Sequence, residues 1–254
     1  MEQFLRTRLL LGNDRFKRLA RSKVTVIGLG AVGSHAAEAL VRAGVGNFRL
    51  VDFDRIKTTN INRQLHALHS TLGKKKVEVA RDRLLDINPA CSLELFDIFA
   101  AQESFPSLFD NAPDLVIDAI DALNPKVQLL VYCYQNHIPV ISSMGAALRT
   151  DPFSITAGDV LESRHCPLAE RMRRLLRKRG VGKGITCVYS LQSPQTKGVD
   201  ADQLSESGDF SRGRKRQILG SLPTITGMFG YALANCAIER LTAAHTEGKS
   251  ESSA

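Results

Sequence analysis

The sequence predicts an α/β fold: a doubly wound, mainly parallel sheet followed by a smaller C-terminal lobe. Three observations predict it. Short apolar runs alternate with segments of helical periodicity through the first 143 residues. A glycine-rich turn joins the first apolar run to the first helix, and the alternation stops after about Gly145. A chain of 254 residues suits one large domain with an added lobe, so we expect domains at 1–150 and 151–254.

The elements of the first half follow from apolar patterning and its stops. Residues 23–27 are a β-branched run that predicts a buried parallel strand. An Ala-rich helix over 31–43 and a strand over 48–52 complete a βαβ unit. Helical periodicity over 74–87 ends at Asn-Pro. The remaining predicted elements are strands at 92–98, 115–119 and 139–143 and a helix at 125–136.

The second half has fewer elements. We expect strands at 155–157 and 186–190, a helix at 167–179, and a mobile polar segment at 192–216. Residues 217–238 carry no charge, and about 20 such residues can cross a bilayer. Its Pro, Thr, Gly and Asn residues favour a helix buried in the core or at a subunit interface, with a peripheral membrane contact as an open alternative.

Composition excludes several protein classes. With 43% hydrophobic and 24% charged residues, the chain is not a disordered or multi-span membrane protein. Its 34 Lys+Arg against 26 Asp+Glu give a net charge of +8, which hints at a polyanionic partner. The five cysteines form no C-x-x-C pair, so we expect neither a disulfide framework nor zinc. The apolar run in the N-terminal segment MEQFLRTRLLLGNDRF is too short and too charged for a signal peptide, which favours a cytoplasmic protein.

A nucleotide site is predicted where the first strand meets the first helix. Gly28, Gly30 and Gly33 form G-x-G-x-x-G in that context, as in Rossmann-like domains. Glycines let the backbone approach a phosphate closely, and Asp52 ends the next strand, where a carboxylate can hold ribose hydroxyls. On these residues alone, an NAD-dependent dehydrogenase is a possible interpretation.

The following residues favour ATP over NAD. Arg63 and Lys76 supply cations that a triphosphate needs and a hydride-transfer site does not. Asp121 ends a central strand, where a carboxylate can hold Mg²⁺. Each residue taken alone has another interpretation: Arg63 as a surface arginine, Lys76 as part of a solvated helix start, and Asp121 as a helix cap. Together, along one predicted sheet edge, they indicate a site.

The segments GLGAVGS, VDFDRIKTTNINRQ, GKKKVEVARDRLLDINP and VIDAID occur in an order that resembles the ThiF/MoeB/E1-like superfamily of ATP-dependent adenylating enzymes. The resemblance covers about residues 3–150 and returns in the last helix. It implies an ATP-binding adenylation domain at 1–150. In such a domain glycines lie along the nucleotide, polar side chains bind the ribose and the phosphates, and one carboxylate binds the metal. In chain order these residues are Gly28, Gly30, Gly33, Asp52, Asp54, Asn60, Arg63, Lys76 and the metal ligand Asp121.

The N-terminus resembles the arm of that superfamily. Its arginine reaches into the ATP site of the partner subunit, so the resemblance implies a homodimer in which Arg6, with Arg8 as an alternative, has this role.

Departures from the superfamily pattern favour one branch. The zinc-holding C-x-x-C pairs of members that adenylate ubiquitin-like sulfur carriers are absent, and neither Cys166 nor Cys187 stands in the context of a crossover-loop cysteine. The segments NINRQLHAL, VIDAIDALNPK, HCPLAERMRRLLRKRGV, GITCVYSLQSPQ and TGMFGYALANCAIERL resemble the branch that dehydrates N6-threonylcarbamoyladenosine in tRNA. Lys126 matches a branch position to which we assign no role.

That branch implies a specific chemistry. ATP activates the threonyl carboxylate, and the neighbouring carbamoyl group closes a ring with loss of water. Because the nucleophile is intramolecular, no protein thiol is needed. The alternatives are adenylation of the C-terminal glycine of a sulfur carrier, and a catalytically idle nucleotide- or RNA-binding module. The family also suggests a sulfur-transfer partner, a cysteine desulfurase system.

A basic surface is predicted in the second half. The helix at 167–179 has an apolar stripe at i, i+4, i+7 and i+8, and arginines fill its other faces. We expect tRNA phosphates to contact Arg171, Arg173, Arg174, Arg177, Lys178, and Arg214 and Lys215 of a basic loop. The alternative is a solvated helix face. His66 and His69 follow the NINRQ segment, and we interpret both as structural.

Overall fold

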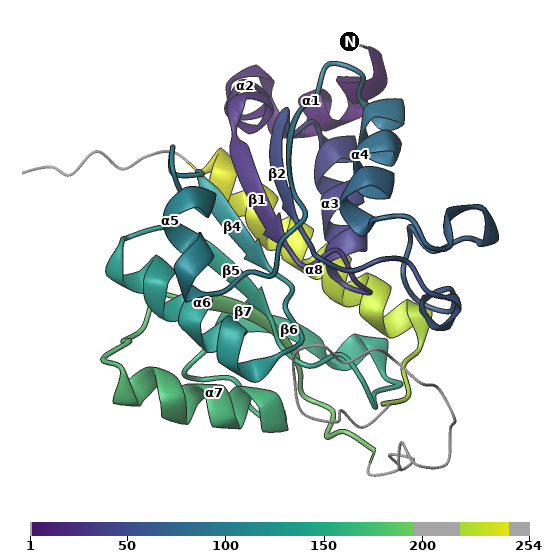
Figure 1. Ribbon diagram of the computed structural model, residues 1–254. Coiled ribbons are helices and arrows are strands. Elements are labelled where there is room, and N and C mark those ends of the chain that lie inside the picture. The colour runs from purple at the N-terminus through teal and green to yellow at the C-terminus, as the bar shows by residue number, and fades with distance from the viewer. Residues whose placement is uncertain (1, 196–218, 244–254) are drawn as a thin grey trace, which may run out of the picture.

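The computed structural model describes residues 2–195 and 219–243. Its centre is a seven-stranded sheet in the order β3-β2-β1-β4-β5-β7-β6 (Figure 1). All neighbouring strands run parallel except β6, which pairs antiparallel with β7 at one edge. The predicted mainly parallel α/β fold is therefore confirmed. The strands are β1 (Lys23–Ile27), β2 (Asn47–Val51), β3 (Ser92–Phe96), β4 (Leu115–Asp118), β5 (Val140–Ser143), β6 (Ile155–Asp159) and β7 (Thr186–Ser190).

Helices cover both faces of the sheet (Figure 1). One face carries α3 (Gly33–Ala43), α4 (Lys76–Ile87) and α8 (Pro223–Thr242), and the other carries α5 (Phe105–Leu108), α6 (Leu123–Gln135) and α7 (Pro167–Lys178). The short helices α1 (Leu5–Leu11) and α2 (Asn13–Arg21) precede β1. Strands β6 and β7 join the sheet formed by the first half of the chain. The domain boundary near residue 150 stays a prediction.

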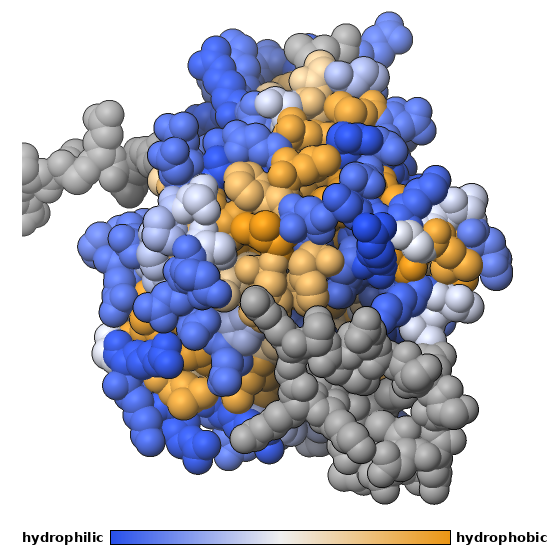
Figure 2. Space-filling view, in the orientation of Figure 1, coloured by the Kyte–Doolittle hydropathy of each residue, from blue (hydrophilic) through white to orange (hydrophobic). Residues whose placement is uncertain are grey.

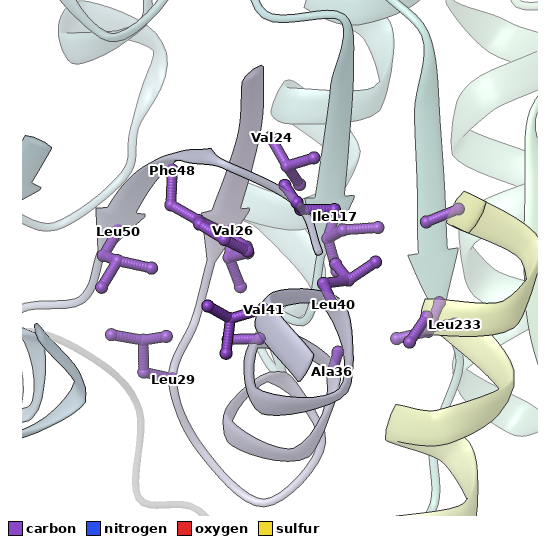
Figure 3. Packing of buried hydrophobic residues seen from close by; sticks show 14 of the residues in the cluster. Val24, Val26, Leu29, Ala36, Leu40, Val41, Phe48, Leu50, Ile117 and Leu233 are labelled. Carbon is purple, nitrogen blue, oxygen red and sulfur yellow. The ribbon is translucent and has the colours of Figure 1, made fainter. Parts of the chain in front are cut away.

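The larger core lies between the sheet and the α3 side (Figure 3). Val24 and Val26 of β1 point toward α3, while Ile27 belongs to the core on the opposite face. This alternation buries both faces of the strand, which is why β1 reads as a continuous apolar run. Leu40 of α3 and Leu233 of α8 complete the packing between the two helices and the strands.

Residues 223–238 of the charge-free stretch lie in α8, which packs along α3. A Cβ at Gly230 would lie 2.6 Å from the carbonyl oxygen of Val32, so the two helices approach too closely for a side chain there. Phe229 and Leu233 are buried, as expected for a helix packed in the core. Within residues 2–195 and 219–243, no helix is long and apolar enough to span a membrane. The expected mobile segment 192–216 lies mostly outside the described residues.

Two helices begin later than predicted, and each has a physical reason. Helix α3 starts at Gly33 because the glycine loop occupies the preceding residues. Helix α4 starts at Lys76 because the carbonyl of Lys74 accepts a hydrogen bond from the amide of Ile56, which keeps the chain extended there.

Candidate functional site

The candidate site lies where the direction of strand order changes. From β1 the chain moves outward to β2 and β3, and it then returns to β4 on the other side of β1. In open parallel sheets a crevice forms at such a point, at the carboxyl ends of the strands. The loops that follow β1 and β4, with Gly28 and Ala119 as their first members, are therefore neighbours at this edge.

The glycine loop after β1 is built by close backbone approach. Gly28 has a φ of +91°, and a Cβ on it would lie 2.7 Å from the carbonyl oxygen of Ala119. A Cβ on Gly33 would lie 1.8 Å from the carbonyl oxygen of Gly28, so only glycine fits there. Gly30 differs, because the nearest atom to a Cβ there is Nε2 of Gln64, at 3.8 Å. The loop thus presents its open side at Gly30, beside the N-terminus of α3, where a phosphate is favoured.

Asp52, Asp54 and Lys76 meet beside this loop. The Lys76 ammonium lies 2.7 Å from Asp54 and 3.8 Å from Asp52, and its side chain is only 5% exposed. Asp52 accepts hydrogen bonds from the amides of Leu29 at 2.7 Å and Asp54 at 2.8 Å. Burial raises the pKa of the Asp52 carboxyl, while Lys76 and the two amides oppose that shift. Each carboxylate oxygen of Asp52 keeps a lone pair that could accept a ribose hydroxyl.

A turn carrying Asn60 and Arg63 lies across from the glycine loop. Leu65 donates from its amide to the hydroxyl of Ser34 on α3, at 3.2 Å, which ties the turn to the helix. The Asn60 amide oxygen accepts from the amide of Lys57 at 3.0 Å. The Arg63 guanidinium donates only to neutral groups, the carbonyl of Thr59 and the side-chain oxygen of Asn62. Its positive charge is therefore paired with no carboxylate in the described part of the chain.

A buried ion pair underlies the Asp121 loop. Lys126 lies 2.8 Å from Asp118, and both side chains are fully buried. Ser142 of β5 donates to the same carboxylate at 2.6 Å. Sequence reasoning missed Asp118, because only the second aspartate of VIDAID was given a role. The signal in the sequence was Lys126, a lysine in the first turn of a mostly apolar helix, since a buried lysine needs a carboxylate partner such as Asp118.

Asp121 is exposed at the end of this loop. No group of three His, Cys, Asp or Glu side chains suited to a metal ion occurs in residues 2–195 and 219–243. One carboxylate is nevertheless enough for Mg²⁺, which usually keeps several waters and is held by one or two carboxylates together with substrate phosphates. The residues present therefore fit a magnesium ion that arrives with a triphosphate.

Comparison with known proteins gives a consistent result. The model of the ThiF family matches residues 4–253. This chain belongs to the ThiF family. It is 44% identical to the tRNA threonylcarbamoyladenosine dehydratase of Bacillus subtilis, over 90% of this chain and 91% of that protein. The crystal structure of the Escherichia coli dehydratase in complex with ATP matches with a TM-score of 0.84 and 33% identity, over 94% of this chain and 93% of that chain. The molybdopterin-synthase adenylyltransferase of Escherichia coli is 36% identical over only 54% of each protein.

Arg6 is the predicted site residue that the ThiF-family fold keeps away from the crevice of its own chain. Phe4 packs beside Gly44, at the C-terminal end of α3. The glycine loop lies at the other end of this 11-residue helix, about 16 Å away. The Arg6 side chain is exposed at that far end of the helix.

Helix α7 displays most of the predicted basic surface. Arg171, Arg174 and Lys178 are exposed, and no described carboxylate pairs with them. Arg177 is exposed too and reaches the carbonyl of Leu161 at 3.5 Å. Arg173 differs, because its guanidinium donates to the carbonyl and hydroxyl of the buried Ser163. Arg214 and Lys215 lie outside the described residues. In Figure 2 hydrophilic residues surround the partly exposed apolar residues of this region, at lower left.

Four of the five cysteines and His66 are buried, whereas His69, His137 and His165 are exposed. His66 is 2% exposed, neither ring nitrogen has a hydrogen-bond partner, and burial lowers its pKa to about 4. The interpretation of His66 as structural agrees with this burial. All five cysteines are free. Burial raises the pKa of Cys91 to about 11 and that of Cys187 to about 12, so neither is an activated nucleophile. Cys166 is buried at the start of α7.

Proposed function

We propose that this chain is an ATP-dependent dehydratase that acts on N6-threonylcarbamoyladenosine in tRNA, next to the anticodon. One observation carries the proposal: similarity to dehydratases extends over about nine-tenths of both chains. Similarity to the adenylyltransferase that serves molybdopterin synthase covers about half of each. The part of the chain that the dehydratases match and the adenylyltransferase does not therefore supports the dehydratase.

The proposed reaction has two steps that balance. A threonyl carboxylate oxygen attacks the α-phosphorus of ATP, and pyrophosphate leaves. The carbamoyl group of the same nucleoside then attacks the acyl carbon and loses a proton, and AMP leaves with the original carboxylate oxygen. The nucleoside has lost one water in total. An intramolecular nucleophile has a high effective concentration, so the buried thiols of Cys166 and Cys187 are not required.

The chain's own residues hold the nucleotide in this proposal. Gly28, Gly30 and Gly33 let the phosphates approach the N-terminus of α3, and Asp52 binds the ribose. The remaining roles belong to side chains at the phosphates, where negative charge develops as pyrophosphate leaves. These are Asn60, Arg63 and Lys76, with Asp121 at a magnesium ion that neutralises phosphate charge. Asp54 belongs to the nucleotide site as the carboxylate that holds Lys76.

The proposal includes a division of labour and an assembly. Residues 1–150 bind and activate ATP, and residues 151–254 bind tRNA and form the C-terminal helix of a homodimer. Arg6 completes the site of the partner, since it lies at the wrong end of α3 to reach its own. The exposed cations of α7 contact tRNA phosphates. We further propose that the protein is cytoplasmic and that a sulfur-transfer system, a cysteine desulfurase, is one of its partners.

The decisive experiment follows the oxygen atom. Purified protein is incubated with ATP, Mg²⁺ and tRNA whose threonylcarbamoyl carboxylate carries ¹⁸O. We expect a nucleoside lighter by one water and one ¹⁸O in the released AMP, both measured by mass spectrometry.

Two controls make this result specific. Omission of ATP should leave the nucleoside unchanged. A protein ending in Gly-Gly should support no exchange of pyrophosphate into ATP. Exchange with that carrier and no mass loss on tRNA would instead establish the alternative, adenylation of a sulfur carrier.

A further inference from the structure

Lys126 is a fully buried cation whose three donors are all used at one place. Its ammonium lies 2.8 Å from the Asp118 carboxylate, 2.9 Å from the carbonyl oxygen of Ile120 and 3.5 Å from the carbonyl oxygen of Asp118. Lys126 stands in the first turn of α6, and a helical side chain points back toward the N-terminus of its helix. It therefore reaches the loop that joins β4 to α6.

The Asp118 carboxylate fixes the same loop from the other side. One oxygen accepts from the amide of Ile120 at 3.1 Å, and the other accepts from the hydroxyl of Ser142 at 2.6 Å. Ile120 is thus held through both its amide and its carbonyl, by the two members of one ion pair. Asp121 is the next residue, so its backbone starts from a fixed position.

The loop also forms one wall of the glycine turn. The carbonyl oxygen of Ala119 would lie 2.7 Å from a Cβ on Gly28, and the amide of Ala119 donates to the carbonyl of Ile27 at 2.9 Å. A shift of the loop therefore changes the distance between Asp121 and the phosphate-binding backbone.

Stability alone does not explain this ion pair. Replacing a buried pair by apolar residues is often neutral or stabilising, because the desolvation of two charges offsets their attraction. Lys126 also holds the carbonyl of Ile120, next to Asp121, so it fixes the loop in addition to pairing with Asp118.

We propose that Lys126 is a positioning residue of the nucleotide site, which holds residues 119–122 so that Asp121 meets the triphosphate and its metal in one orientation. The proposal rests on the proposed function only through the role of Asp121. It predicts a defect confined to ligands that carry the β- and γ-phosphates with magnesium.

The test uses Lys126→Met and the double variant Asp118→Asn/Lys126→Met. The single variant leaves a buried carboxylate without its cation and should unfold at a lower temperature. The double variant removes both charges and should recover most of that loss. The matched control is Lys183→Met, an exposed lysine that precedes β7 and so lies at the opposite edge of the sheet.

For both Lys126 variants we expect kcat for dehydration to fall about 100-fold, the effect of a misplacement of about 1 Å. Calorimetry should show affinity for ATP with Mg²⁺ falling about tenfold, or 1.4 kcal/mol, with affinity for AMP unchanged. The control should match the wild type in both measurements.

Two outcomes would overturn the proposal. If the double variant recovers kcat together with thermal stability, Lys126 is only a structural residue. If AMP and ATP with Mg²⁺ lose affinity equally, the defect is not one of Asp121 placement. A wild-type chain that binds both nucleotides but leaves tRNA unchanged would contradict the proposed function, while the binding measurements would still decide the role of Lys126.

Discussion

Two lysines at the carboxyl edge of β1, β2 and β4 are buried and paired with carboxylates, whereas most cations on α7 are exposed. Lys76 and Lys126 are 5% and 0% exposed, and each lies within 3 Å of a carboxylate. Arg171, Arg174 and Lys178 stand in solvent without a carboxylate partner among the described residues. A preorganised edge suits a small ligand of fixed shape. An exposed cationic helix suits a polyanion, whose binding comes from released counterions and needs little fixed geometry.

The largest expected effect is at the edge, at Asp121. Asp121→Asn removes a charge where the triphosphate and its metal are proposed to bind, and kcat should fall about 1000-fold. Because Asp121 is exposed, the melting temperature should stay that of the wild type. Steady-state kinetics and thermal unfolding check this, with the exposed Asp82→Asn as the control. A kcat within a few-fold of the wild type would remove Asp121 from the site.

The rigidity of the edge can be tested at two glycines. Gly33→Ala should lower the free energy of unfolding by about 3 kcal/mol, because its Cβ would lie 1.8 Å from a carbonyl oxygen. Gly30→Ala has space for its methyl group and should leave that free energy unchanged while weakening ATP binding. Urea unfolding and calorimetry separate the two effects. Equal stability of the two variants would show that the loop adapts and is not preorganised.

Burial at the edge also predicts a pH dependence. The pKa of His66 falls from 6.5 to about 4 in the folded chain, through burial first and then the nearby Arg83. Between these pH values the unfolded chain binds the proton and the folded chain does not, so stability falls as the pH drops. Glu38 opposes the shift, while His35 and Lys76 add to it.

The variant His66→Leu removes this titration. At pH 5 the wild type should have lost about 2 kcal/mol of unfolding free energy relative to pH 8 through His66, and the variant should not show that loss. Urea unfolding at both pH values measures it. His69→Leu, at an exposed histidine three residues away, should keep the wild-type dependence. Identical pH profiles for wild type and His66→Leu would contradict the assignment.

The smallest effect is expected on α7. Arg171→Gln/Arg174→Gln should weaken tRNA binding about tenfold at physiological salt and lower the slope of log affinity against log salt by about 2. ATP affinity should not change. The control is Lys17→Gln/Arg21→Gln, two exposed cations on α2. An equal loss in both double variants would show that general positive charge, and not α7, attracts the RNA.

The sequence predicted the strands of the sheet to within two residues, because parallel strands are buried on both faces and read as continuous apolar runs. It did not predict that β7 lies beside β5, with β6 antiparallel at the edge. That pairing depends on contacts between distant segments, which no local pattern encodes.

For the site, motifs identified the residues whose neighbours are set by local backbone. The glycine loop, Asp52 and Lys76 do meet, since all three follow or precede strands at one edge. The Asp118–Lys126 pair was missed because a lysine is ordinarily a surface residue. Helical periodicity placed Arg173 on a basic face but could not show that its guanidinium bonds to Ser163.

The free cysteines offer a way to watch this molecule open. Cys91, Cys133 and Cys187 are buried in three different parts of the fold, and burial raises the thiol pKa of each. At neutral pH a buried thiol reacts with an alkylating reagent only when its surroundings unfold transiently. The alkylation rates of these three cysteines, measured by peptide mass spectrometry, would therefore report local unfolding at three separate places.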